Sequence, residues 1–169
     1  MAGNIARKQT DREPSDGPLD FGGLSNHLGY CLRRAQLASF QNFRASFAAL
    51  DLRPTQYSVL VLINNNPGRK QSEIAAALGI KRSNFVSLMD ELERRNLAER
   101  RKAQSDRRSH ALFLTEAGVQ FMKKLDLAHQ HHQDHLTAKV GEENSALLIE
   151  LLKRIGEGGP FELDEADGE

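Results

Sequence analysis

The stretch SEIAAALGIKRSNFVSLMDELERR, residues 72–95, decides the fold that the sequence predicts. Its first part reads as a short helix, 73–78, which Ser72 precedes and Gly79 stops, and Arg82 to Arg95 reads as a second helix. The apolar residues of the second helix recur at offsets of three, four and seven, so they share one face, which consists of Phe85, Leu88, Met89 and Leu92. Two helices joined by a tight glycine turn are typical of a helix-turn-helix.

A basic hairpin is predicted directly after these two helices. Asn96 can end the second helix in a left-handed conformation. Residues 97–100 and 111–114 are short strand candidates on either side of the polar, basic segment 101–110. We therefore predict the winged variant of the motif, within a mainly α-helical protein that carries a small β-hairpin wing.

Four further helices are expected around this unit. The chain has no Trp and few aromatic residues, so its core must consist mostly of aliphatic side chains, which suits packed helices. The first is expected to run from Leu24 to the break at 51–54, and the second to follow Thr55 as its cap. The third is expected to start at Thr115-Glu116-Ala117-Gly118, and the fourth to span Asn144–Ile155.

Charge is distributed unevenly along the chain. The 23 bases and 23 acids cancel, but the segment 156–169 holds six acids and no base, and we expect it to be an acidic disordered tail. The rest of the chain contains 17 acids and 23 bases, and the segment from Arg69 to Arg108 contains 11 bases and six acids. The middle of the chain is therefore a basic module, which favours DNA as a partner. Residues 1–20 lack apolar periodicity and are expected to form a disordered N-terminal arm.

Several function classes are excluded at this stage. The N-terminus lacks the apolar run of a secretory signal or membrane span, and the single cysteine, Cys31, cannot form an intrachain disulfide. We therefore expect a cytoplasmic protein with no membrane partner. The sequence has no phosphate-cradling glycine motif, nucleophile elbow or metal-catalytic set, so neither an enzyme nor a cofactor is predicted.

The polar face of the second helix carries the candidate DNA-contacting residues. Small hydroxyl and amide side chains let a helix approach base edges closely, whereas basic residues at its start suit phosphates. A basic side chain at the tip of the hairpin can enter a narrow minor groove. The candidates are Ser72, Lys81, Arg82, Ser83, Asn84, Ser87, Arg107 and Arg108, with Asp106 as support for the wing. The alternative is a solvated helix face with surface salt bridges.

The sequence resembles the MarR (multiple antibiotic resistance regulator) family of winged helix-turn-helix repressors. The resemblance rests on Ser72-Glu73-Ile74-Ala75, Leu78-Gly79-Ile80, and Asp106-Arg107-Arg108 followed by Leu112-Phe113-Leu114-Thr115-Glu116-Ala117-Gly118. It implies a homodimer on a pseudo-palindromic operator, with recognition helices in successive major grooves and wings in the minor groove. Residues 21–155 would form the subunit, with a DNA-binding lobe at about 55–115 and dimerisation helices at about 21–50 and 116–155. One departure is Asn96, where the family commonly has glycine.

The resemblance also implies a small-molecule pocket between the dimerisation helices and the DNA-binding lobe. The stretch 28–36 is similar to the branch of the family that regulates aromatic-acid degradation, so the expected effector is a small aromatic acid or its CoA thioester. We predict effector contacts from His27, Tyr30, Arg34 and Tyr57, which complement a carboxylate and oxygen substituents. The alternative is that Tyr30 and the neighbouring arginines serve the subunit interface.

Two other forms of control are weighed beside this one. Cys31 can act as a redox sensor in a cysteine-based regulator, although a small buried apolar role is favoured because no second cysteine can resolve an oxidised thiol. His129, His131, His132 and His135, with Asp134, can bind a metal or respond to pH, but no metal site is predicted. A third alternative is an architectural winged-helix protein without any effector. The sequence leaves the operator, the effector and the direction of the response open.

Overall fold

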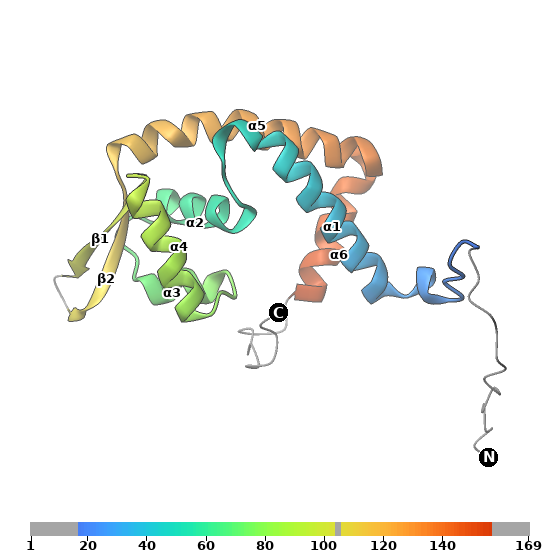
Figure 1. Cartoon of the computed structure of the whole chain (residues 1–169), viewed down its shortest axis with the longest axis horizontal. Coiled ribbons are helices and arrows are strands. Elements are labelled where there is room, and N and C mark those ends of the chain that lie inside the picture. Colours follow the sequence, from blue (N-terminus) through green and yellow to red (C-terminus); the bar gives the residue numbers. More distant parts are fainter. Residues whose placement is uncertain (1–16, 104–105, 157–169) are drawn as a thin grey trace, which may run out of the picture. The chain divides into compact units, whose positions relative to one another are not determined.

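The computed structural model describes residues 17–103 and 106–156, with residues 103 and 106–109 described by their backbone alone (Figure 1). The described residues up to Gln36 form one compact unit, and those from Leu37 form a second. The expected disordered arm and acidic tail lie outside the described residues, apart from 17–20 and Gly156.

Six α-helices and one hairpin follow the predicted order within the described residues. This arrangement confirms the mainly α fold with a small β wing. The elements are a 3-10 turn η1 (Leu24–Asn26), α1 (Leu28–Ser46), a 3-10 turn η2 (Ala48–Leu50), α2 (Pro54–Asn65), α3 (Gln71–Ala77), α4 (Arg82–Arg94), β1 (Ala98–Ala103), β2 (Asp106–Leu114), α5 (Glu116–Val140) and α6 (Glu142–Gly156). None of these helices is long and apolar enough to cross a membrane.

Two predicted helix starts were wrong. Extended backbone at His27 separates η1 from α1, so the first α-helix begins at Leu28 instead of Leu24. Thr55 does not cap α2, because Pro54 already occupies the first turn and the Arg53 N–H donates to Gln56 Oε1 at 2.9 Å. Proline is suited to this position because it has no N–H that would be left unbonded.

The wing strands are longer than predicted. The pairing continues from Ala98 opposite Leu114 to Lys102 opposite His110, and a register irregularity precedes the pair of Ala103 and Asp106. The segment 101–110, expected to separate the strands, therefore lies largely within them.

The connection between α2 and α3 pairs with the other edge of β2. The Gly68 N–H donates to the Leu112 carbonyl at 2.8 Å, and the Leu112 N–H donates to the Arg69 carbonyl at 2.9 Å. Gly68 has a φ of +85°, which favours glycine. These bonds attach the base of the wing to the helix-turn-helix.

The main core lies where α2, α4, the hairpin and α5 meet. The apolar stripe of α4 is buried as predicted, except that Leu88 is only partly covered. Fully buried side chains include Val59, Leu60, Ile63, Phe85, Met89, Leu92, Leu112 and Leu125. The core therefore fixes which side of α4 faces outward.

The start of α5 packs closely against the residue that opens the hairpin. Asn96 is left-handed with a φ of 54°, as predicted, and its carbonyl accepts a hydrogen bond from Thr115 Oγ1. Thr115 also caps α5 by accepting from the Gly118 N–H at 3.0 Å. A Cβ on Gly118 would lie 1.9 Å from the Leu97 carbonyl oxygen. Only glycine fits at this contact.

An aromatic cluster fixes α5 to α2 and to the C-terminal part of α1. Phe43 and Phe47 stack on each other with ring centroids 3.8 Å apart, and the Tyr57 ring lies 5.3 Å from that of Phe47. The His132 ring packs edge-on against Phe43, and its Nδ1 is 2.5 Å from Asn42 Oδ1. Because an amide oxygen only accepts, Nδ1 of His132 is the donor.

Replacing Gly118 by Ala should destabilise the fold strongly. The added methyl group meets a backbone oxygen that cannot rotate away, so we expect a loss of about 3 kcal/mol in the free energy of unfolding. Urea unfolding measures this loss. The control is Gly23→Ala, whose Cβ would meet nothing within 4 Å and whose backbone is already right-handed. Equal stabilities of the two variants would contradict the packing described for α5.

The stability of the second unit should fall as the pH is lowered from 7.5 to 6. Burial, reinforced by His129, His135 and His131, lowers the pKa of His132 below its usual value of 6.5. Over this range the unfolded chain binds more protons than the folded chain, so acidification favours unfolding. The decrease should be smaller in His132→Gln and should persist in His110→Gln, in which an exposed imidazole of the wing is lost. Equal pH dependence in both variants would refute this role for His132.

Candidate DNA-binding surface

The outward face of α4 presents the predicted base-contacting residues. Ser83 and Ser87 are exposed on the side opposite Phe85 and Met89, which are fully buried, and Asn84 is exposed on the flank of that side. All three belong to the first half of the helix, the end that enters the groove in helix-turn-helix proteins. The structure therefore brings these three predicted side chains together.

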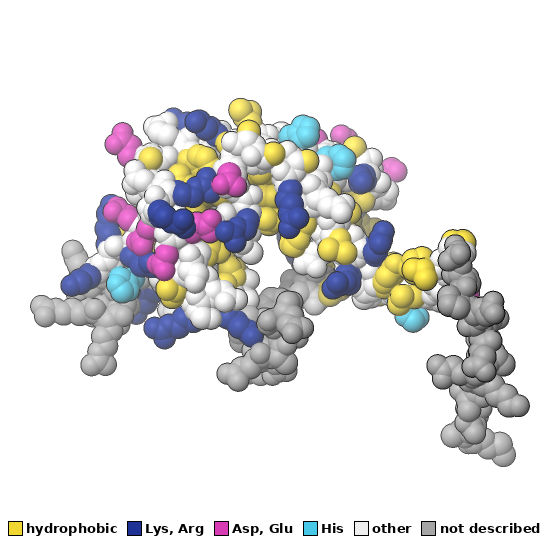
Figure 2. Space-filling model, in the orientation of Figure 1, with side chains coloured by type: hydrophobic (Ala, Val, Ile, Leu, Met, Phe, Trp, Pro, Cys, Tyr) yellow, Lys and Arg dark blue, Asp and Glu magenta, His cyan; other side chains and the backbone are white. Residues whose placement is uncertain are grey.

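The predicted phosphate-contacting residues lie at the helix starts. Lys81 precedes α4 and is half-buried, Arg82 is its exposed first residue, and Ser72 is exposed in the first turn of α3. Within the described part of the chain, Lys81 and Arg82 form no ion pair, so their charges are available to a ligand. Figure 2 shows Lys and Arg side chains along the lower border of the lobe that contains α3 and α4.

The remaining DNA-binding candidates belong to the wing. Asp106, Arg107 and Arg108 are residues of β2, and their side chains lie outside the described atoms. Arg108 was expected at the hairpin tip, but it lies within β2, between Asp106, which pairs with Ala103, and His110. The extended pairing of the strands explains this difference.

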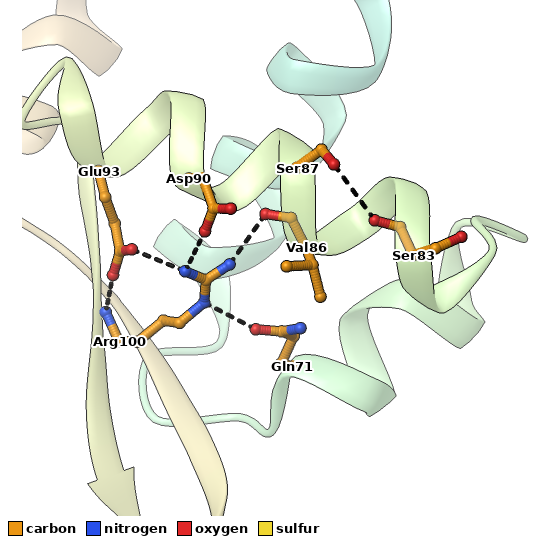
Figure 3. Close-up of polar contacts among 7 residues, drawn as sticks. All are labelled: Gln71, Ser83, Val86, Ser87, Asp90, Glu93 and Arg100. Carbon is orange, nitrogen blue, oxygen red and sulfur yellow. Dashed lines mark hydrogen bonds and ion pairs between the residues drawn. The ribbon is translucent and has the colours of Figure 1, made fainter.

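Arg100, which the sequence reasoning missed, joins β1 to both helices of the motif (Figure 3). Its Nε donates to Gln71 Oε1 of α3 at 2.9 Å, and its Nη2 donates to the Val86 carbonyl of α4 at 3.0 Å. Its Nη1 donates to Asp90 Oδ1 at 2.6 Å and to Glu93 Oε2 at 2.7 Å. The Arg100 N–H also donates to Glu93 Oε1 at 2.8 Å. This ion-pair cluster could have been recognised in the sequence from two acids one turn apart on α4, Asp90 and Glu93, followed by Arg100 in the next strand.

Arg95, also missed, attaches the C-terminal end of α4 to the turn that follows α1. Its Nη1 donates to the Asp51 carbonyl at 2.6 Å and its Nη2 to the Leu50 carbonyl at 2.9 Å. Its guanidinium also lies over the ring of Phe121 in α5, 5.7 Å from the centroid. Arg95 therefore links the C-terminal end of α4 to both the η2 turn and α5.

The predicted effector residues fall into both compact units. In the first unit, His27 and Arg34 are exposed and the Tyr30 ring packs against Phe21 at 6.2 Å. In the second unit, Tyr57 belongs to the aromatic cluster, and burial together with Asp126 raises the pKa of its hydroxyl. Their joint role in effector binding stays a prediction.

The other two control candidates have simple environments. Cys31 is exposed rather than buried, and its Sγ donates to the Ser25 carbonyl. The histidines of α5 mostly serve packing: His129 stacks on Tyr57, His131 Nδ1 lies 3.1 Å from Ser46 Oγ, and His132 contacts Asn42. Among the described residues, no three His, Cys, Asp or Glu side chains form a group able to hold a metal ion.

Comparisons with known proteins identify the family. Residues 50–109 match the MarR family. The chain is 33% identical over 138 residues to the putative transcriptional regulatory protein for the hcr operon of Thauera aromatica, which covers 81% of this chain and 83% of that protein. The solved transcriptional repressor CouR bound to a 23-mer DNA duplex is 45% identical with a TM-score of 0.79, and CouR bound to p-coumaroyl-CoA is 41% identical with a TM-score of 0.77. Each of these two matches covers 83% of this chain and 99% of the other.

The family match extends over α2, α3, α4, β1 and the first residues of β2, and the relatives each match more than four fifths of the chain. The chain therefore belongs to the MarR family and is a winged helix-turn-helix transcriptional repressor of that type, not an enzyme.

Proposed function

We propose that the chain acts as a homodimer that represses transcription from a pseudo-palindromic operator and leaves it when an aromatic acyl-CoA thioester or the corresponding aromatic acid binds. The observation that carries the DNA-binding part is the exposed Ser83, Asn84 and Ser87 face of α4, in a fold shared with a relative solved on DNA. Inserted into a major groove, this face would present hydroxyl and amide groups to base edges.

The apolar surface of α6 supports a dimer. Large apolar side chains of this helix are exposed in the single chain, namely Leu147, Leu148, Ile149, Leu151, Leu152 and Ile155. Leu28, Leu37 and Phe40 of α1 are exposed as well. Exposed apolar side chains gathered on a helix mark an interface, because leaving them in water is unfavourable. A second copy of the chain would cover both helices.

The effector class rests on two observations. The sequence of α1 resembles the aromatic-acid branch of the family, and CouR, which is 41% identical, has been solved with p-coumaroyl-CoA. An effector changes DNA affinity only if it binds one dimer geometry more tightly than the other. The contacts of Arg95 with Leu50, Asp51 and Phe121 give a direct route from η2 and α5 to the recognition helix.

Replacing Arg108 by Ala should strongly weaken operator binding while the protein remains a folded dimer. The wing would lose its minor-groove contact, and we expect affinity to fall by a factor of about 100, or about 3 kcal/mol. The duplex is selected from random sequence with the unchanged protein, and binding is measured by gel shift at moderate salt. The control, Lys124→Ala, removes an exposed base from α5. Unchanged affinity of Arg108→Ala would reject the wing assignment.

Hydroxycinnamoyl-CoA thioesters should release the dimer from the selected duplex, and free coenzyme A should not. A panel of aromatic acids and their CoA thioesters is titrated against the complex and followed by fluorescence anisotropy. Arg34→Ala should raise the half-maximal effector concentration about tenfold, because a cation that pairs with the ligand is lost. Arg44→Ala, at another exposed base of α1, serves as the control. If no member of the panel releases the DNA, the effector proposal is wrong.

A further inference from the structure

Four of the five side-chain N–H groups of Arg100 have acceptors inside the protein. Its side chain is only 16% exposed, although it belongs to a strand of the basic wing. Its three side-chain nitrogens donate to four groups on α3 and α4, as Figure 3 shows. Because four of its five N–H groups already have acceptors and the side chain is largely buried, the guanidinium has little capacity left to bind a DNA phosphate.

The charges around Arg100 lead to the same conclusion. Its guanidinium lies between the carboxylates of Asp90 and Glu93, so the local net charge is negative. Asp90 is 60% exposed, on the same helix as Ser83 and Ser87. An unneutralised acid at this place would repel the DNA backbone. A base placed to attract DNA would not be surrounded by two acids.

The contacts fix the wing at several points along α4. Val86 and Glu93 are seven residues apart, which corresponds to about 10 Å along a helix. Gln71 adds a contact from α3, so β1 is held against both helices of the motif. A planar guanidinium sets direction as well as distance, since each of its N–H groups points along a fixed line. A lysine at this position would supply the charge but not the same set of directions.

We propose that Arg100 is a positioning residue for sequence recognition, which fixes the angle between the wing and α4 without contacting DNA. The inference rests on the proposed DNA-binding function. If the wing is held at a fixed angle to α4, both can contact DNA at the same time only where the spacing and width of the grooves match that angle. Random DNA, held mainly through phosphates, does not require this match. Loss of Arg100 therefore reduces discrimination rather than general affinity.

The experiment compares Arg100→Met with Arg101→Met, a loss of the same charge from the neighbouring, 57% exposed position of β1. Affinity for the selected duplex and for a random duplex is measured at several salt concentrations. For Arg100→Met we expect the selected duplex to bind about tenfold more weakly. Binding to random DNA should stay within about twofold of that of Arg101→Met, which loses the same charge, and the dependence of log affinity on log salt should match that of Arg101→Met. Arg100→Lys should show a similar loss of discrimination despite its retained charge.

A direct phosphate contact predicts the opposite pattern. It would weaken binding to both duplexes equally and reduce the salt slope by about one. That outcome, or unchanged binding of both duplexes, overturns the proposal. If Arg108→Ala also leaves operator binding intact, the proposed function fails too; loss in Arg108→Ala with no effect in Arg100→Met refutes only the positioning role.

A second variant, at the partner Glu93, tests the proposal independently in case Arg100→Met fails to fold. Glu93→Gln keeps the shape of the acceptor but removes a negative charge beside the DNA surface, so simple electrostatics predicts tighter binding to every duplex. The positioning role predicts weaker discrimination, because Glu93 accepts from both the backbone and the side chain of Arg100. Thermal unfolding of each variant verifies that the lobe remains folded. An increase in affinity with unchanged discrimination would overturn the proposal.

Discussion

Burial of one side of α4 is the constraint on which the DNA-binding surface depends. Phe85, Met89 and Leu92 are completely buried against α2, the hairpin and α5. Because a helix has a fixed angular spacing, this burial turns positions 83, 84 and 87 to the outside. The face proposed to read DNA is thus determined by the core. Rotating α4 would expose a phenylalanine and a methionine, which costs several kcal/mol.

The features that were predictable from sequence follow from local physical rules. The glycine turn at 79, the left-handed Asn96 and the Thr115 cap each depend on a few adjacent residues, and all three are present in the structure. The extension of β1 and β2 through the charged segment 101–110 was not predictable in this way, because its stability comes from pairing across the hairpin. The attachment of 68–70 to β2 is another contact between segments distant in the sequence.

The same distinction holds for the candidate site. Ser83 and Ser87 were identified because helical spacing alone places them opposite the apolar stripe, with Asn84 on the flank of that face. Arg100 was missed because it was counted as one more base of a basic wing, whereas its partners Gln71 and Glu93 lie on two other elements. Solvent-exposed side chains on one helix face are easier to predict from sequence than side chains that bond to each other across elements, because the latter depend on tertiary packing.

Ion pairing also reduces the number of free positive charges in the basic middle segment. Arg69 pairs with Glu73, Arg100 with Asp90 and Glu93, and Arg101 with Glu99. The Arg95 guanidinium is bound to two backbone carbonyls. Much of the positive charge counted between 69 and 108 therefore serves the architecture of the lobe. Lys81 and Arg82, which form no ion pair among the described residues, lie beside the exposed Ser83 and Asn84, so free positive charge is concentrated at the start of α4. The position of each charged side chain in this lobe therefore matters more for binding than the net charge of the chain.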